Sequence, residues 1–210
     1  MAIKKYNLPK AYLSYSAIEL WRKDKPRFRR KYYEGIEEPG TVYSLFGSEV
    51  HEQIEKDPKY SSIRLPKAEH RMEVDVCGVK VLGYIDTFDP DTFAFGEYKS
   101  GIRKPDGSPR WTQADVNQHD QLPFYSLLIQ EKYGVKINHT YLVWLETAMR
   151  EEKVRMNGVI LGGERELYLT GEWERFERRM YQYDRERMKK WIVESAKEIS
   201  EDYECYLKSK

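Results

Sequence analysis

The sequence is poor in cysteine and has no long apolar run. Its 210 residues include two cysteines, Cys77 and Cys205, which lie far apart in the chain. Two distant thiols provide neither a disulfide framework nor the ligand pattern of a zinc knuckle. No segment approaches the roughly 20 consecutive apolar residues that cross a bilayer, and the first residues lack the apolar core of a signal peptide. We therefore expect a cytoplasmic protein with no membrane partner.

An excess of charge of one sign is also missing. The 36 basic and 35 acidic residues leave a net charge of +1. Such a balance argues neither for nor against a nucleic-acid partner. The local distribution is less even, because residues 22–31 (RKDKPRFRRK) carry seven cations and one acid. A run of this kind is most often a solvated face, but it could also contact phosphates.

The spacing of apolar residues divides the chain into helical and extended segments. Helical spacing predicts helices over residues 14–34, 45–56, 112–134 and from about 172 onward. Alternation with many Val, Ile, Phe and Tyr predicts strands over 72–76, 79–88, 92–99, 139–147 and 165–170. No repeat, low-complexity segment or long linker is present in the sequence, so we expect a single domain spanning residues 1–210.

Several of these elements carry end signals. Ser14 or Ser16 can cap the first helix, and Ser48 can cap the second. Pro26 is expected to end or bend the first helix, and Pro123 to kink the third or delay its start. Asn157-Gly158 is a hairpin-turn dipeptide between the last two strands. The order of elements predicts an α/β fold bordering on α+β, in which helices flank a central mixed sheet and a long helix closes the chain.

The stretch GYIDTFDPDTFAFGEYKSG, residues 83–101, places carboxylates inside segments that have the composition of strands. If it forms a hairpin that turns at Asp91, facing residues have numbers that sum to 183, and Asp86 lies opposite Glu97. Directly opposed Cβ atoms are about 5 Å apart, and like charges so placed destabilise a sheet. Lys99 points to the same face as Glu97, because side chains alternate along a strand.

Two arrangements can stabilise this acidic pair. Lys99 can neutralise one carboxylate, or a divalent cation such as Mg²⁺, which prefers oxygen ligands, can lie between both. The alternative is a solvent-facing hairpin of mixed charge, because the pattern E-x-K is common. Flanking residues such as Ile85 and Phe95 favour buried strands and therefore a site. Asp89 and Asp91 flank a proline and are interpreted as turn residues.

Four motifs in this order resemble the PD-(D/E)xK nuclease superfamily, in particular the RecB-type nuclease domain. They are LSYSAIELW (13–21) as the opening helix, FGSEVHEQIE (46–55) with its histidine, G-x-I-D (83–86) with E-x-K (97–99), and QLPFY (121–125) as Q-x-x-x-Y. The resemblance covers about residues 13–134. The literal dipeptide Pro90-Asp91 lies in the turn and is not the motif's acid in this interpretation.

The resemblance implies a restriction-endonuclease-like core and a metal-dependent nuclease. Asp86, Glu97 and Lys99 would be the catalytic residues. Mg²⁺ or Mn²⁺ would be bound by His51, Asp86, Glu97 and the backbone carbonyl of Tyr98. Lys99 would orient or polarise the attacking water and offset phosphate charge. A lone histidine is more often structural, so the role of His51 depends on the resemblance.

Substrate contacts are expected from two further groups of residues. Gln121 and Tyr125 are four apart on one helical face and would hold a substrate phosphate or support the site. For Tyr125 a place in the core is an equally good interpretation. Arg27 and Arg30, from the basic run, and Arg103, after the hairpin, could guide the phosphate backbone.

The sequence departs from some relatives in one respect. CRISPR-adaptation nucleases and helicase-linked nucleases of this family carry four cysteines for an iron–sulfur cluster, one of them before a proline where this chain has Lys25-Pro26. Four thiolates are needed and the chain has two, so we predict no such cluster.

The leading hypothesis is therefore a metal-dependent deoxyribonuclease, an exonuclease acting at single- or double-stranded DNA ends in recombination, repair or phage DNA processing. Protein partners in a recombination, repair or CRISPR complex are compatible with it. The preference for exonuclease over endonuclease rests on family analogy alone. The alternatives are a nucleic-acid-binding or assembly module of the same fold that does not cut, and an unrelated α/β protein with a chance E-x-K hairpin.

Overall fold

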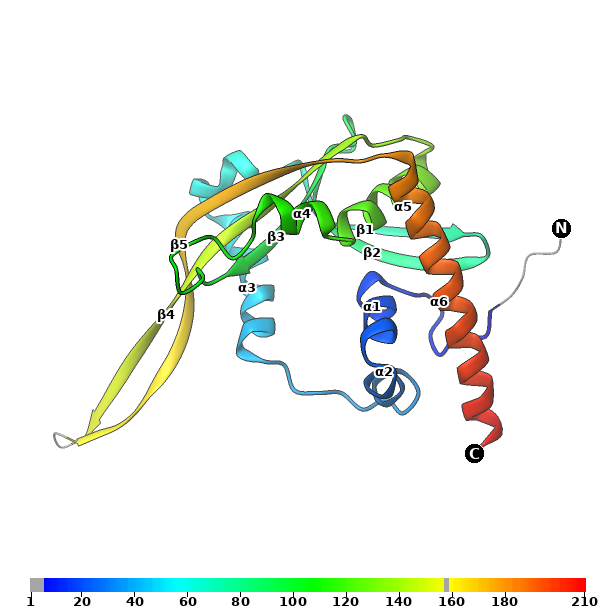
Figure 1. The fold of residues 1–210 in the computed structure, drawn as a ribbon. Helices are drawn as coiled ribbons and strands as arrows, with labels where there is room; N and C mark the ends of the chain where they lie inside the picture. Colours follow the sequence, from blue (N-terminus) through cyan, green and yellow to red (C-terminus); the bar gives the residue numbers. More distant parts are fainter. Residues whose placement is uncertain (1–5, 157–158) are drawn as a thin grey trace.

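The computed structural model describes residues 6–156 and 159–210 (Figure 1). In chain order, the elements are α1 (Tyr15–Lys23), α2 (Lys25–Tyr32), α3 (Val42–Lys56), the 3₁₀ helix η1 (Pro58–Ile63), β1 (Lys67–Val76), β2 (Val79–Phe88), β3 (Phe95–Gly101), α4 (Gln113–Gln118), α5 (Gln121–Tyr133), β4 (His139–Met156), β5 (Val159–Arg179) and α6 (Gln182–Lys208). Among the described residues, no helix is both long enough and apolar enough to cross a membrane.

The five strands form one sheet in the order β1-β2-β3-β4-β5. β3 and β4 run parallel, and every other neighbouring pair is antiparallel. The predicted α/β fold, with a mixed sheet flanked by helices and a long C-terminal helix, is therefore confirmed. β4 and β5 are much longer than expected, and their far halves leave the body as a two-stranded ribbon (Figure 1). The predicted turn at Asn157-Gly158 lies outside the described residues.

Apolar side chains cover both faces of the sheet. On β4 they alternate: Leu142 and Trp144 belong to a core with α1, α2, α5 and α6, whereas Tyr141, Val143 and Leu145 belong to a second core with α3 and η1. A strand buried on both faces has a continuous apolar sequence, which explains the run YLVWL.

β2 and β3 form a short hairpin that then opens into a fork. Thr87 pairs with Gly96 and Phe88 with Phe95, so facing residues sum to 183, as predicted from the sequence. The turn runs from Asp89 to Ala94, whose backbone groups are bonded at 2.9 Å. Beyond Thr87 the two strands separate, because β3 continues beside β4 whereas β2 continues beside β1. The predicted ladder pair of Asp86 with Glu97 is therefore wrong, since the β2–β3 ladder ends at Thr87 and Gly96.

The expected final helix from about residue 172 is wrong. β5 continues to Arg179, and α6 begins at Gln182. Phe176, Arg178 and Met180 are buried in alternation, which is strand periodicity. Arg178 occupies one of these inward positions, where it donates to the carbonyls of Val116 and His119. Because an arginine stands where an apolar residue is expected, the sequence does not show the alternation of a strand here.

Two other helices also differ from expectation. α3 begins at Val42, so Ser48 lies inside the helix and is not its N-cap. The predicted start at residue 45 was late because Val42 and Tyr43 in the first turn are exposed and add nothing to the buried stripe. The segment 112–134 divides into α4 and α5. Pro123 is the third residue of α5, where a backbone N–H has no helical partner, which confirms the predicted later start.

The first predicted helix ends where expected. Ser14 accepts a hydrogen bond from Ala17 N and caps α1, and the chain breaks at Asp24 before α2 begins. α1 and α2 contribute to the first core and α3 to the second, and residues 33–41 connect α2 to α3 at the ends farthest from the sheet (Figure 1).

Gly96→Ala is expected to destabilise the protein. A Cβ at Gly96 would overlap the ring of Tyr141, which is 4% exposed and has the Arg175 guanidinium 3.7 Å from its centroid. Overpacking of this kind costs about 1–3 kcal/mol in the free energy of unfolding. Gly47→Ala is the matched control, because its Cβ would meet nothing within 4 Å in a helix. Urea denaturation should show the loss for Gly96→Ala and none for Gly47→Ala; an equal effect of both would contradict the packing described.

Candidate active site

The fork between β2 and β3 holds the acidic residues of the predicted site. Asp86 lies near the end of β2, and Glu97 and Lys99 lie on β3. At the fork, the Tyr98 amide faces Asp86, and its N–H donates to Asp86 Oδ2 at 2.7 Å. The Asp86 carboxylate thus replaces the backbone carbonyl that would accept from the Tyr98 N–H in a continued β2–β3 ladder. This hydrogen bond holds Asp86 beside Glu97, the residue before Tyr98.

Glu97 is a carboxylate buried with half of its hydrogen-bonding capacity unused. Its side chain is 2% exposed, and Oε1 accepts from Lys99 Nζ at 2.5 Å. The other oxygen, Oε2, is buried and has no hydrogen-bond partner. Burial and then the nearby Asp86 carboxylate raise the pKa of Glu97 well above its ordinary value, and Lys99 opposes the shift. An unpartnered buried carboxylate oxygen is costly, so a cation that binds there would remove a large penalty.

The charges of Asp86 and Lys99 depend on the same cluster. Burial raises the pKa of Asp86, while Lys99 and the Tyr98 N–H counteract part of the increase. Burial acts to lower the pKa of Lys99, but the carboxylates of Glu97 and Asp86 outweigh it and hold the pKa above its ordinary value. Two acids and one lysine therefore share the site, with one negative charge left over when all are ionised.

His51 approaches this cluster from α3. Its Nδ1 lies 3.9 Å from Asp86 Oδ1 and 3.6 Å from Glu69 Oε1, and its ring centroid is 6.1 Å from that of Tyr98. The structure thus brings the predicted histidine to the predicted aspartate, although 35 positions separate them in the sequence.

Glu69 is a neighbour of the site that the sequence interpretation missed. Its signal was available, because β1 and β2 pair about Cys77-Gly78 with facing numbers that sum to 155, which places residue 69 opposite Asp86. Glu69 itself is absent from the ladder and has a φ of 42°. Its carboxylate is 64% exposed, and it faces His51.

Gln121 and Tyr125 belong to the same network. Lys99 Nζ donates to Gln121 Oε1 at 3.0 Å, and Gln121 Nε2 donates to the Tyr125 hydroxyl at 3.2 Å. Gln121 is the first residue of α5, and Tyr125 is 5% exposed one turn later. Lys99 is therefore fixed by Glu97 from its own strand and by Gln121 from a helix.

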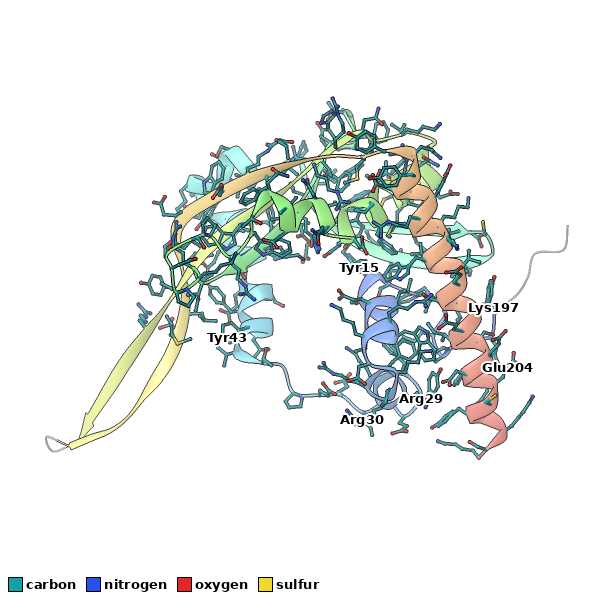
Figure 2. The ribbon with its side chains drawn as sticks, viewed as in Figure 1. Tyr15, Arg29, Arg30, Tyr43, Lys197 and Glu204 are labelled. Carbon is teal, nitrogen blue, oxygen red and sulfur yellow. The ribbon has the colours of Figure 1, made fainter. Side chains whose placement is uncertain are left out.

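The three predicted phosphate-binding arginines lie outside this network. Arg27 and Arg30 both pair with Glu38, with Arg27 Nε 2.8 Å and Arg30 3.8 Å from its carboxylate. Figure 2 shows Arg30 on α2, at the end of the α1–α2 unit away from the sheet. Arg103 pairs with Glu146 at 2.7 Å. Their role in binding a substrate stays a prediction.

Two cavities meet at Lys99. One, of about 340 Å³, is lined by residues of α3 and β3 that include His51, and by Glu69. The other, of about 520 Å³, lies between α1, β2 and α5 and includes Gln121. Lys99 lines both. A larger cavity of about 680 Å³ is lined by α1, α2 and residues 37–41, and the lining does not include the acidic pair.

Within residues 6–156 and 159–210, the cluster offers donors to a divalent metal but not a complete set of ligands. In the part of the chain that the structure describes, no three His, Cys, Asp or Glu side chains stand close enough together to form a complete ligand group. The donors nevertheless suit Mg²⁺ or Mn²⁺, which prefer carboxylate oxygen, with imidazole also accepted by Mn²⁺. Glu97 Oε2 is the strongest indication, since it is buried beside Asp86 with no partner. His51, Asp86 and Glu97 are the side chains that could hold the metal.

Glu97→Gln is expected to stabilise the metal-free protein at neutral pH. The folded-state pKa of Glu97 lies above its ordinary value of 4.5, so the folded protein retains a proton that the unfolded chain has lost. The free energy of unfolding of the wild type therefore falls as pH rises from about 4.5 through the raised pKa. Glutamine removes this loss and leaves the charge of Lys99 near Asp86, whose pKa it lowers.

The measurement is urea denaturation in EDTA from pH 4.5 to 9. The wild type should lose stability over this range relative to Glu97→Gln, while the exposed α6 control Glu201→Gln should follow the wild type. Parallel curves for all three proteins would show that Glu97 carries no burial penalty.

Comparisons with known proteins show a shared fold. No family model and no curated protein matches the sequence. A protein of Eubacterium rectale provisionally described as an exonuclease aligns with a TM-score of 0.54 and 11% identity, over 90% of this chain and 82% of that one. A phage-related exonuclease of Haemophilus somnus aligns with a TM-score of 0.55 and 12% identity, over 94% of this chain and 86% of that one. At these identities the likeness establishes the α/β fold.

Proposed function

We propose that the chain is a divalent-metal-dependent deoxyribonuclease that hydrolyses phosphodiester bonds, working as an exonuclease at DNA ends. The observation that carries this proposal is the buried Glu97 carboxylate, whose free oxygen lies in one cluster with Asp86 and Lys99. This acid–acid–lysine cluster is the arrangement that the resemblance to RecB-type PD-(D/E)xK nucleases implies. The two solved structures named as exonucleases, which share the fold, support the same class of activity.

Each residue of the cluster has a task in such a reaction. Asp86, Glu97, His51 and the backbone carbonyl of Tyr98 would hold Mg²⁺ or Mn²⁺. When bound, the metal would lower the pKa of a water and stabilise charge on the phosphoryl oxygens. Lys99 would orient the attacking water and offset the negative charge that develops at phosphorus. Gln121 is a positioning residue, since it holds the Lys99 ammonium at 3.0 Å.

An iron–sulfur cluster is not part of this proposal. Cys77 lies in the β1–β2 turn and Cys205 in α6, and both are exposed free thiols. A cluster of this kind requires four thiolate ligands. In this chain, α6 packs instead against the opening helix: Arg22 Nε donates to Ser195 Oγ at 3.1 Å, and Trp21 Nε1 to Glu198 at 3.1 Å.

The proposal is tested by incubating the protein with end-labelled linear single- and double-stranded DNA, with closed circular DNA and with RNA, each with Mg²⁺ or Mn²⁺. We expect stepwise shortening of linear DNA and no cutting of closed circles. Circles cut as fast as linear DNA would replace the exonuclease with an endonuclease. DNA binding without cleavage of any substrate would favour the second candidate, a non-cleaving binding module of the same fold.

A further inference from the structure

The cavity of about 520 Å³ beside Lys99 has the size of a small-molecule site, because such sites measure about 300–1,000 Å³. Its walls come from residues 10–17, from α2, from β2 and from the first turns of α5. It reaches Gln121 and Lys99 at the proposed reaction centre. We call it the tyrosine cavity, because five tyrosines line it.

Tyrosine dominates its wall. The lining includes Tyr12, Tyr15, Tyr32, Tyr84 and Tyr125. Three of them contact other residues of the cavity or the core, and Tyr84 faces Arg71 across the β1–β2 ladder. Tyr125 bonds Gln121, Tyr15 packs edge-on against Phe124 with centroids 5.5 Å apart, and Tyr32 packs on Phe28 at 4.5 Å. Figure 2 shows Tyr15 at the end of α1 nearest the sheet.

Tyr12 and Tyr84 differ from the other three because they are exposed. Their side chains are 36% and 50% exposed, although they line a concave site. Single exposed aromatic residues are ordinary on a protein surface. Two that meet at a cavity next to a buried carboxylate cluster are more specific, since aromatic faces are the surfaces on which unpaired bases stack.

The charges of the cavity suit the same ligand. Lys10 lies 5.1 Å above the Tyr32 ring, and Lys99 lines the cavity beside Gln121. The acidic residue of the lining, Glu19, pairs with Lys23 at 2.8 Å. Aromatic rings and two lysines in one cavity match a nucleotide, whose base is flat and whose phosphates are anionic.

We propose that the tyrosine cavity binds an unpaired base of the DNA strand being cut, stacked on Tyr12 and Tyr84, next to the phosphate at Lys99. The choice of DNA rests on the proposed function. A base inside a duplex is covered by its neighbours and must leave the stack to enter a cavity of this size. The substrate is therefore single-stranded DNA, or a duplex end that has opened.

Binding in EDTA tests this assignment separately from cleavage. The probe is a short single-stranded oligothymidylate that carries one 2-aminopurine, placed in turn at each position, and a matched strand with an abasic site there. Stacking on a ring is worth about 1–3 kcal/mol per base, or about 5- to 150-fold in Kd. We expect 2-aminopurine fluorescence to be quenched on binding and Kd to rise about tenfold in Tyr84→Ala and in Tyr12→Ala.

Three comparisons make the test specific. Tyr84→Phe and Tyr12→Phe keep the rings and should bind as the wild type does. The abasic site should weaken binding by the wild type more than binding by Tyr84→Ala, because that variant has already lost one of the two ring contacts with the base. Tyr183→Ala, at a 64% exposed tyrosine of α6, should leave Kd unchanged.

The assignment is overturned by alanine variants that bind as tightly as the wild type, by an abasic penalty equal in all proteins, or by no binding of single strands. Base-dependent binding by a protein that cleaves nothing would retain the cavity and reject the nuclease. Metal-dependent cleavage by a protein whose tyrosine variants bind as tightly as the wild type would retain the nuclease and reject the base-binding cavity.

Discussion

Lys99→Met is expected to lower the rate of metal-dependent DNA hydrolysis about a thousandfold, within the range for loss of a charge-stabilising or proton-handling group. Methionine keeps the length of the side chain and removes its charge. Lys99 Nζ lies 2.5 Å from Glu97 Oε1 and 3.0 Å from Gln121 Oε1, so the ammonium is fixed where it would face the scissile phosphate. Its loss removes both the positive charge and the group that orients water.

Single-turnover rates at saturating enzyme measure this effect, with circular dichroism to confirm folding. Lys190→Met, at a lysine of α6 that is 74% exposed, is the matched control and should cleave at the wild-type rate. A rate for Lys99→Met within tenfold of wild type would remove Lys99 from the reaction centre. Equal losses in both variants would point to a general effect of lysine removal.

Asp86→Asn is expected to lower hydrolysis by at least a thousandfold and to weaken metal binding, because its carboxylate is one of the two that would hold the cation. Asparagine can still accept the hydrogen bond from Tyr98 N, which the native Oδ2 accepts at 2.7 Å. The fork between β2 and β3 should therefore remain folded. Calorimetric titration with Mn²⁺ and cleavage rates measured on the same preparation separate the loss of metal from the loss of structure.

Asp91→Asn provides the control for this prediction. Asp91 is the aspartate of the literal Pro-Asp dipeptide, and it is an exposed turn residue whose N–H donates to Asp89 Oδ1 at 2.9 Å. We expect no change in rate or in metal affinity. A large loss in Asp91→Asn with an active Asp86→Asn would show that the motif had been aligned on the wrong acid.

The local geometry of the site followed from the sequence because hairpin register is a local property. A turn near Asp91 fixes facing residues at a sum of 183, and Thr87 and Gly96 are indeed paired. The same arithmetic about Cys77-Gly78 would have found Glu69, since its partner position is Asp86. Register alone did not place the carboxylates, because β2 and β3 separate beyond Thr87 and Asp86 accepts from Tyr98 N instead of facing Glu97 in a ladder.

The approach of His51 is a different case, because α3 reaches the cluster only through tertiary packing. Phe46, Val50 and Ile54 bury one face of α3 against the sheet, and this packing brings His51 to 3.9 Å from Asp86. Spacing in the sequence carries no information about that distance. The resemblance to a known motif, and not the spacing, led to the prediction that His51 belongs to the site.

The late start of α6 shows how a buried polar residue conceals a strand. Arg178 is 5% exposed and lies 3.7 Å from Asp184, while Phe176 and Met180 are buried on either side of it. A cation at an inward position breaks the apolar alternation by which strands are found. The remaining aromatic residues then have helical spacing, which led to a helix predicted ten residues too early, from Glu172 instead of Gln182.

Metal add-back to EDTA-treated protein tests the proposed reaction centre most directly. Release of labelled nucleotides from linear DNA should be absent in EDTA, rise with added Mg²⁺ or Mn²⁺, and stay about a thousandfold or more below the wild-type rate in Asp86→Asn and Lys99→Met at every metal concentration. Cleavage that persists in EDTA, or that is unchanged in both variants, would contradict a metal-dependent nuclease centred on Asp86, Glu97 and Lys99.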